Sequence, residues 1–350
     1  MIRGDGIGPE VIDATLPVMV RAAALEGVTV EVTHYDWGAD RYLREGSVMP
    51  DDGAERVREH DAVLFGAVGR PDVPDHELVR GLIVALRQEL DLAVNLRPIK
   101  ALPGAPSAKA DADVDMLIVR ENSEGEYLGI GGRAFQGTPR ELSIEASVHT
   151  RAGIERAARY AFEQARHRRG TVTLASKANV LRYGFTLWDE VVGEVAAEHP
   201  DVRFDMVLVD ALAARFVEAP ESFDVVLCSN LFGDVLADLA AVYMGGLGMA
   251  PSANILPGGD VPGVFEPIHG SAPDIAGTGV ANPSACVLSA ALLLEHCGVE
   301  AGAARMTDAL HRTLAAGRTT PDLGGTETTD SFAAAILEAL ETAPEIAART

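Results

Sequence analysis

Two aspartates stand four residues apart in a stretch that has the pattern of a helix following a buried strand. Residues 223–228 form an apolar run, and Asn230 is a residue type that often caps the start of a helix. Asp234 and Asp238 should then lie on one face of that helix. Such a pair either complements the helix dipole or holds a hard divalent cation such as Mg²⁺ or Mn²⁺. This stretch alone favours the dipole interpretation, and the rest of the chain reverses that balance.

Arginines follow or flank apolar segments at three places in the chain. Arg97 follows a short strand-like run, and Arg120 follows the buried strand predicted at 115–119. Arg87 lies beside the apolar stripe of a predicted helix. A single arginine is usually a solvated surface group. Several guanidinium groups placed after strands, in an acidic chain, instead favour the recognition of carboxylates.

Two further residues are candidates for proton transfer. Lys177 follows the strand predicted at 171–174, where a lysine either stays solvated or acts as a base. Tyr127 lies in a polar stretch, where it is either an amphipathic surface residue or a general acid beside charged groups.

Glycine-rich loops occur near both ends of the chain. The turn at 4–10 either approaches a nucleotide or simply joins a strand to a helix, and it lacks the spacing of the dinucleotide fingerprint. The loop at 266–274 carries an acid that could bind the hydroxyls of an adenosine ribose, or it is a plain surface loop.

Composition narrows the class of protein. The chain has 350 residues, 47% of them hydrophobic, and a net charge of −23. This charge argues against a nucleic-acid partner and against an anionic membrane surface. The longest apolar run, 285–294, is too short to span a bilayer. Three cysteines in apolar segments predict reduced core thiols and a cytoplasmic location.

Strands and helices alternate along the sequence, which predicts an α/β fold. In open α/β sheets, ligands bind at the carboxyl ends of strands, so the charged residues that follow strands are expected to converge. Arginines for an anion, aspartates for a metal, and a lysine and a tyrosine for proton transfer suit a polycarboxylate chelated to a divalent cation. The other segments predicted are strands at 28–35, 62–68, 142–149 and 204–209, helices at 10–24, 77–91, 152–166, 187–198, 284–296, 302–316 and 330–340, and a linker at 105–112.

Several motifs in a fixed order give the chain a family resemblance. It resembles the β-decarboxylating dehydrogenases that act on isocitrate, 3-isopropylmalate, homoisocitrate, tartrate and D-malate. That family usually begins with a full strand before the first glycine-rich turn, whereas here only Met1 and Ile2 precede it. The motifs are Gly4–Glu10, Asn95–Pro98, Val119–Asn122, Lys177–Asn179, Asp210–Ala211, Ser229–Leu239 and Glu266–Ile275.

The resemblance implies an isocitrate/isopropylmalate dehydrogenase-like two-domain α/β fold with a non-Rossmann nucleotide site. Residues 1–95 and 247–350 would form the nucleotide-binding domain, and residues 96–246 the central domain that dimerises and holds metal and substrate. It also implies NAD and Mg²⁺ or Mn²⁺ as cofactors. Lys177 and Asp210 would reach the site from the partner subunit of a homodimer.

The same resemblance assigns roles to individual residues. Tyr127 and Lys177 would be catalytic, as the proton donor to the enol product and as the base for the 2-hydroxyl. Asp274 would accept hydrogen bonds from the ribose and so favour NAD. The substrate would be bound by Arg87, Arg97, Arg120, Ile83 and Asp210, the metal by Asp210, Asp234 and Asp238, and the cofactor by His269, Gly270, Ser271, Ala272, Pro273, Asp274, Ile275 and Asn282.

The substrate is expected to be a small (2R)-malate-type diacid, with D-malate or tartrate ahead of 3-isopropylmalate. Ile83 is apolar, which disfavours a third carboxylate and hence isocitrate. The stretches at 121–127 and 250–254 look most like tartrate and D-malate enzymes, whereas 177–181 and 322–325 look more like 3-isopropylmalate dehydrogenases. A catalytically silent regulatory subunit and an acidic scaffold protein are alternatives of another class.

Overall fold

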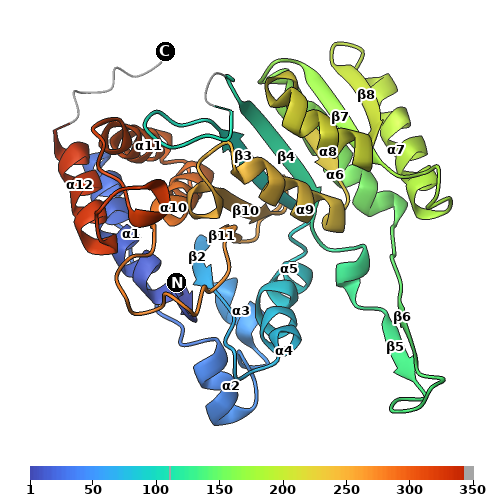
Figure 1. Cartoon of the computed structure of the whole chain (residues 1–350), viewed down its shortest axis with the longest axis horizontal. Helices are drawn as coiled ribbons and strands as arrows, with labels where there is room; N and C mark the ends of the chain where they lie inside the picture. Colours follow the sequence, from blue (N-terminus) through green and yellow to red (C-terminus); the bar gives the residue numbers. More distant parts are fainter. Residues whose placement is uncertain (110–111, 343–350) are drawn as a thin grey trace.

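A nine-stranded mixed sheet runs through the computed structural model, which describes residues 1–109 and 112–342 (Figure 1). The strand order is β1-β2-β11-β10-β3-β4-β9-β7-β8. The predicted α/β class is confirmed, and the division into two domains stays a prediction. The strands are β1 (Ile2–Gly4), β2 (Ala62–Ala67), β3 (Val94–Lys100), β4 (Asp115–Glu121), β7 (Thr171–Ser176), β8 (Arg203–Leu208), β9 (Val225–Cys228), β10 (Pro251–Ile255) and β11 (Gly263–Pro267).

Helices cover the sheet, and a two-stranded arm of β5 (Gly131–Ala134) and β6 (Leu142–Glu145) projects from the body (Figure 1). None of the described helices is long and apolar enough to cross a membrane. The helices are α1 (Gly8–Leu25), α2 (Ala39–Glu45), α3 (Gly53–Val57), α4 (Asp75–Val79), α5 (Ala85–Glu89), α6 (Arg151–Arg166), α7 (Gly184–Glu198), α8 (Val209–Glu218), α9 (Asn230–Ala241), α10 (Ser284–His296), α11 (Glu300–Ala315) and α12 (Thr329–Glu341).

The expectation that Arg97 and Arg120 follow strands is wrong. Both lie within strands, because β3 and β4 are longer than predicted and pair antiparallel. Asn95 lies opposite Arg120, and Arg97 lies opposite Ile118. Directly opposed residues share a face of the sheet, and so do residues two apart in one strand. The register therefore places Asn95, Arg97 and Arg120 on one face.

The helix predicted at 77–91 is interrupted by a π-helical turn. Residues Arg80–Val84 form this turn between α4 and α5. A π turn contains an extra residue and shifts the side chains that follow it around the helix, and such turns are often found at functional sites. Arg87 is consequently buried in the turn after it, although the sequence pattern placed it beside the apolar stripe.

Three smaller predictions are wrong. Residues 28–35 form no strand. Their neighbour β1 is only three residues long, and it pairs with this segment through a single bridge, between Ile2 and Tyr35. Asn230 is the first residue of α9 rather than its cap, because its side-chain carbonyl accepts from Arg120. Cys297 is exposed just after the end of α10, while the other two cysteines are buried free thiols.

Most of the remaining boundaries agree closely with the sequence pattern. Helix α10 spans the predicted 284–296, and α6, α7, α11 and α12 differ from prediction by a few residues at their ends. The strand predicted at 142–149 is limited to β6, whose side chains are exposed. The predicted linker at 105–112 is loop where it is described, and residues 110–111 lie outside the described residues.

Two apolar clusters stabilise the sheet. The larger packs the central strands against helices such as α1, α6, α7, α10 and α11. The smaller includes Trp37, Phe65 and Leu82, and it packs β2 against the segment from α2 to α5. Asn95, Arg97 and Arg120 lie on strands β3 and β4 of this buried frame, so packing on both sides limits their movement.

Candidate active site

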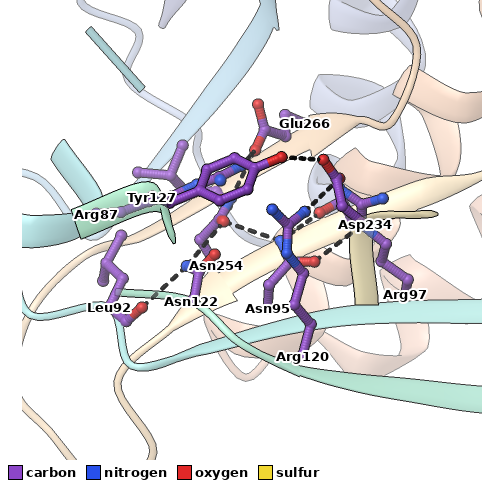
Figure 2. A network of polar contacts seen from close by, with 12 residues as sticks. Arg87, Leu92, Asn95, Arg97, Arg120, Asn122, Tyr127, Asp234, Asn254 and Glu266 are labelled. Carbon is purple, nitrogen blue, oxygen red and sulfur yellow. Dashed lines mark hydrogen bonds and ion pairs between the residues drawn. The ribbon is translucent and has the colours of Figure 1, made fainter. Parts of the chain in front are cut away.

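The carboxylate of Asp234 is the centre of the polar site (Figure 2). Its Oδ1 accepts from Nη2 of Arg97 at 3.0 Å and from Nη1 of Arg120 at 2.5 Å. Its Oδ2 accepts from the hydroxyl of Tyr127 at 2.5 Å. Helix α9 supplies the aspartate, β3 and β4 supply the arginines, and the 3₁₀ turn Glu126–Leu128 supplies the tyrosine. The fold thus brings together four of the residues predicted from the sequence.

The electrostatics of this group favour an ionised aspartate and a protonated tyrosine. Burial by itself would raise the pKa of Asp234, but the positive charges of Arg120 and Arg97 outweigh burial and lower the pKa to about 2. Burial and the nearby Arg97 lower the pKa of the fully buried Arg120 to about 10, so this guanidinium still carries its charge at neutral pH. Burial, together with Asp234, raises the pKa of Tyr127 and keeps its proton available.

Asp238 lies one turn further along α9 and faces the same arginine. Its Oδ1 is 3.5 Å from Nη1 of Arg97, and its side chain is about half exposed. Burial and repulsion from Asp234 raise the pKa of Asp238 above its ordinary value, against the attraction of Arg97. The i, i+4 spacing therefore places two carboxylates at one surface, one of them open to solvent.

A cavity of about 230 Å³ lies in front of the arginines. Arg87 lines it from α5 and donates to Oε1 of Glu266 at 2.8 Å. Ile83 lines it from the π turn. An apolar wall and convergent guanidinium groups suit an anion that carries a short carbon chain. The predicted site residues that share this cavity are Ile83, Arg87, Arg97, Arg120, Tyr127, Asp234, His269 and Gly270.

Lys177 and Asp210 are not among the residues that line this cavity. They pair with each other, with Nζ of Lys177 2.9 Å from Oδ1 of Asp210. The hydrogen bond from Lys177 lowers the pKa of Asp210. Within the described part of the single chain, no three His, Cys, Asp or Glu side chains gather into a metal-binding group. A site completed by Lys177 and Asp210 of the partner subunit stays a prediction.

The glycine-rich loops from both ends of the sequence meet beside the cavity. The amide of Ile7 donates to the carbonyl of Ser271 at 2.8 Å. A Cβ on Gly6 would lie 2.0 Å from that carbonyl, and Gly6 has a φ of +57°, so the close approach requires glycine. The buried carboxylate of Asp5 accepts from the amides of Ala39 at 2.8 Å and Gly69 at 3.1 Å, which fixes the neighbouring loop.

The other predicted cofactor residues extend along the same loop. Nδ1 of His269 lies 2.9 Å from the carbonyl of Gly270, and burial lowers the pKa of His269. Asn282 is buried, donates to Asp322 at 3.0 Å and accepts from the amide of Ser284. Asp274 is exposed on the loop. The loop therefore offers a neutral imidazole, backbone groups and one solvent-facing acid to a ligand.

Sequence reasoning missed the buried amides behind the arginines. Asn95 and Asn254 are fully buried on β3 and β10, and Asn122 is almost fully buried just after β4. A buried amide is costly unless it is hydrogen-bonded. An asparagine between two apolar neighbours in a strand was the signal that could have identified Asn95 and Asn254.

Comparisons with known proteins agree with this architecture. The family model "Isocitrate/isopropylmalate dehydrogenase" matches residues 1–336. A probable tartrate dehydrogenase/decarboxylase from Agrobacterium vitis is 46% identical over 344 residues, which are 97% of this chain and 96% of that protein. The 3-isopropylmalate dehydrogenase of Thermobifida fusca is 48% identical over 318 residues, 90% of each chain.

A solved structure of a related enzyme has a similar fold. The isocitrate dehydrogenase of Methylococcus capsulatus superposes with a TM-score of 0.88 at 39% identity, over 97% of this chain and 98% of that one. The fold, the relatives and the site define an oxidoreductase of the β-decarboxylating type. The chain belongs to the isocitrate/isopropylmalate dehydrogenase family.

Proposed function

We propose that this protein catalyses the NAD- and divalent-metal-dependent oxidative decarboxylation of a (2R)-malate-type 2-hydroxy diacid, with D-malate or tartrate favoured, to a 2-oxo acid and CO₂. The observation that carries the proposal is the convergence of Arg97, Arg120 and Tyr127 on Asp234 beside a small cavity. The proposal is supported by the relatives described as tartrate dehydrogenase/decarboxylase.

In the proposed reaction, this chain's residues bind the diacid and move its protons. Arg97 and Arg120 bind its carboxylates, together with Arg87. Lys177 of the partner subunit takes the proton of the 2-hydroxyl, and Tyr127 returns a proton to carbon after CO₂ leaves. When bound, NAD accepts the hydride, and the divalent cation stabilises negative charge on oxygen.

The carboxylates fit a hard divalent cation. Asp234 and Asp238 offer only oxygen donors, which suit Mg²⁺ or Mn²⁺. The pKa of Asp234, lowered to about 2, keeps one of them ionised at any physiological pH. We assign the cation to Asp234 and Asp238, with Asp210 of the partner subunit as a further ligand.

A homodimer is part of the proposal, and exposed apolar side chains support it. Val235 on α9 is 62% exposed although its neighbour Asp234 belongs to the site. Val217 on α8 is 61% exposed, and α8 packs against α9. Ile144 on the projecting arm is 63% exposed. A second copy could cover these apolar side chains and bring its Lys177–Asp210 pair to the site.

The cofactor assignment rests on the loop that contains Asp274. An exposed acid there can accept from ribose hydroxyls and repel a 2′-phosphate, which favours NAD. The buried free thiols Cys228 and Cys286 support a reducing, cytoplasmic location for the reaction.

3-Isopropylmalate is the second candidate substrate. The cavity wall of Val79, Ile83 and Val84 is apolar and could receive an alkyl group. The Thermobifida fusca 3-isopropylmalate dehydrogenase is also among the similar proteins. No acidic or basic residue of this wall would recognise the third carboxylate of isocitrate.

The decisive experiment is a substrate screen of the purified protein, with NADH formation as the readout. D-malate, the tartrate isomers, 3-isopropylmalate and isocitrate are each supplied with NAD⁺ and Mn²⁺, and a parallel series contains a chelator. We expect turnover of D-malate or tartrate that the chelator abolishes. Turnover of 3-isopropylmalate alone would establish the second candidate, and no NADH from any acid would point to a silent binding subunit.

A further inference from the structure

A line of buried polar side chains connects Arg87 with Arg97 (Figure 2). Oε1 of Glu266 accepts from Nη2 of Arg87 at 2.8 Å and from Nδ2 of Asn254 at 2.9 Å. Oδ1 of Asn254 accepts from Nδ2 of Asn95 at 2.9 Å. Oδ1 of Asn95 in turn accepts from Nε of Arg97 at 2.9 Å. None of the five residues exposes more than 8% of its surface.

The direction of each hydrogen bond in this line follows from its ends. A guanidinium group can only donate, so Arg97 requires the carbonyl oxygen of Asn95. The amide nitrogen of Asn95 then faces the oxygen of Asn254, and the nitrogen of Asn254 is left to face Glu266. Rotating the Asn254 amide by half a turn would set donor against donor toward Asn95 and acceptor against acceptor toward Glu266. The arrangement therefore has one orientation.

Asn254 uses its full hydrogen-bonding capacity. Besides the two bonds of the line, its Oδ1 accepts from Asn122 at 3.0 Å and its Nδ2 donates to the carbonyl of Val264 at 2.8 Å. Nε of Arg87, by contrast, is buried and has no hydrogen-bond partner among the described residues. The amide is thus fixed by four bonds, while the Arg87 guanidinium group that it supports through Glu266 keeps one buried donor unpaired.

We propose that Asn254 is a positioning residue that sets the spacing and orientation of the Arg87 and Arg97 guanidinium groups. This inference rests on the proposed function in one respect, that the two groups receive the carboxylates of a diacid. Asn254 itself is absent from the cavity wall, so it acts through Glu266 and Asn95. A carboxylate at this place would face Glu266 without a proton to donate, and an apolar side chain would leave buried polar groups unpaired.

The test compares wild-type protein with Asn254→Ala, and with Asn254→Ser as a milder change in case the first variant folds poorly. Leu294→Ala serves as the control, because Leu294 is buried in the core on α10 and lies outside the polar line. For each protein we measure the thermal midpoint, KM and kcat for D-malate with NAD⁺ and Mn²⁺, D-malate affinity by calorimetry, and the crystal structure.

We expect the Asn254 variants to show displaced Arg87 or Arg97 side chains, and KM and Kd for D-malate raised by about 10- to 100-fold with a much smaller change in kcat. Leu294→Ala should lower the thermal midpoint and leave KM unchanged. Two results would overturn the inference: guanidinium groups that keep their positions in the Asn254 variants, or displaced groups with unchanged KM and Kd. If wild-type protein neither binds nor converts D-malate, D-malate is not the substrate, and the crystal structures alone decide the positioning role.

Discussion

The hydroxyl of Tyr127 donates a hydrogen bond of 2.5 Å to the Asp234 carboxylate. The same carboxylate accepts from Arg97 and Arg120, and the Arg120 guanidinium lies 5.2 Å from the centre of the Tyr127 ring. One aspartate therefore satisfies the candidate proton donor and two candidate anion-binding groups. A diacid that binds these arginines must compete with Asp234. Binding of the diacid and the hydrogen bonding of the Asp234 carboxylate are therefore linked.

Replacing Tyr127 by phenylalanine should slow product formation far more than it weakens substrate binding. The raised pKa of Tyr127 keeps the hydroxyl protonated, so it can act as a general acid, a role whose loss typically costs about 10²- to 10⁴-fold in rate. We expect kcat for pyruvate formation from D-malate to fall within that range, with KM changed less than about threefold. Steady-state kinetics measure both, and an undiminished kcat would exclude Tyr127 as the proton donor.

Acid should remove a stabilising contribution of Asp234. The pKa is lowered from 3.8 to about 2 in the folded state, so the contribution is present above about pH 4 and is lost as the pH falls toward 2. It amounts to at most about 2 kcal/mol, since partial exposure weakens it. We expect the gap in thermal midpoint between wild type and Asp234→Asn to be largest above pH 5 and to shrink in acid.

Asp201 provides the matched control for that measurement. Its hydrogen bond from Arg166 also lowers its pKa to about 2, but the pair is exposed at the surface. Because solvent screens this exposed pair, Asp201→Asn should give a smaller gap and a smaller change with pH than Asp234→Asn. A pH-independent gap for Asp234→Asn would mean that the ion pairs do not lower the pKa of Asp234.

Mixing two inactive variants should restore activity if the site is shared between subunits. In a heterodimer of Lys177→Ala and Asp234→Asn, one site would contain only wild-type residues. Random reassociation should then recover about a quarter of wild-type activity, because half of the dimers carry one intact site of two. A mixture of Lys177→Ala with Asp210→Asn is the control and should stay inactive, since both residues come from the donating subunit. If the first mixture also stays inactive, Lys177 acts within its own subunit.

Removing Asp274, the exposed acid of the loop assigned to the cofactor, should weaken the proposed preference for NAD. In Asp274→Ala, the ribose hydroxyls lose an acceptor and a 2′-phosphate loses a repulsive charge. We expect the ratio of kcat/KM for NAD⁺ to that for NADP⁺ to fall by about 10- to 100-fold. Asp260, an exposed acid in the loop between β10 and β11, supplies the control variant Asp260→Ala, which should keep the ratio. An unchanged ratio in Asp274→Ala would remove the basis for assigning NAD.

The sequence by itself determined the local features of this protein. The spacing of Asp234 and Asp238 placed both carboxylates on one helix face, because helix geometry depends only on residues a few positions apart. Both contact Arg97 in the structure. The apolar pattern predicted helix α10 at its observed bounds, and the ordered motifs indicated the family.

Only the tertiary structure decided how these features meet. Arg97 and Arg120 converge through the antiparallel register of β3 and β4, and register depends on pairing between distant segments, which local patterns do not specify. Arg87 donates a hydrogen bond to Glu266 although 179 residues separate the two in the sequence. The buried asparagines behind the arginines are identifiable as a connected line only when β3, β10 and β11 are neighbours, because hydrogen bonds between side chains form by proximity in space and not by spacing along the chain.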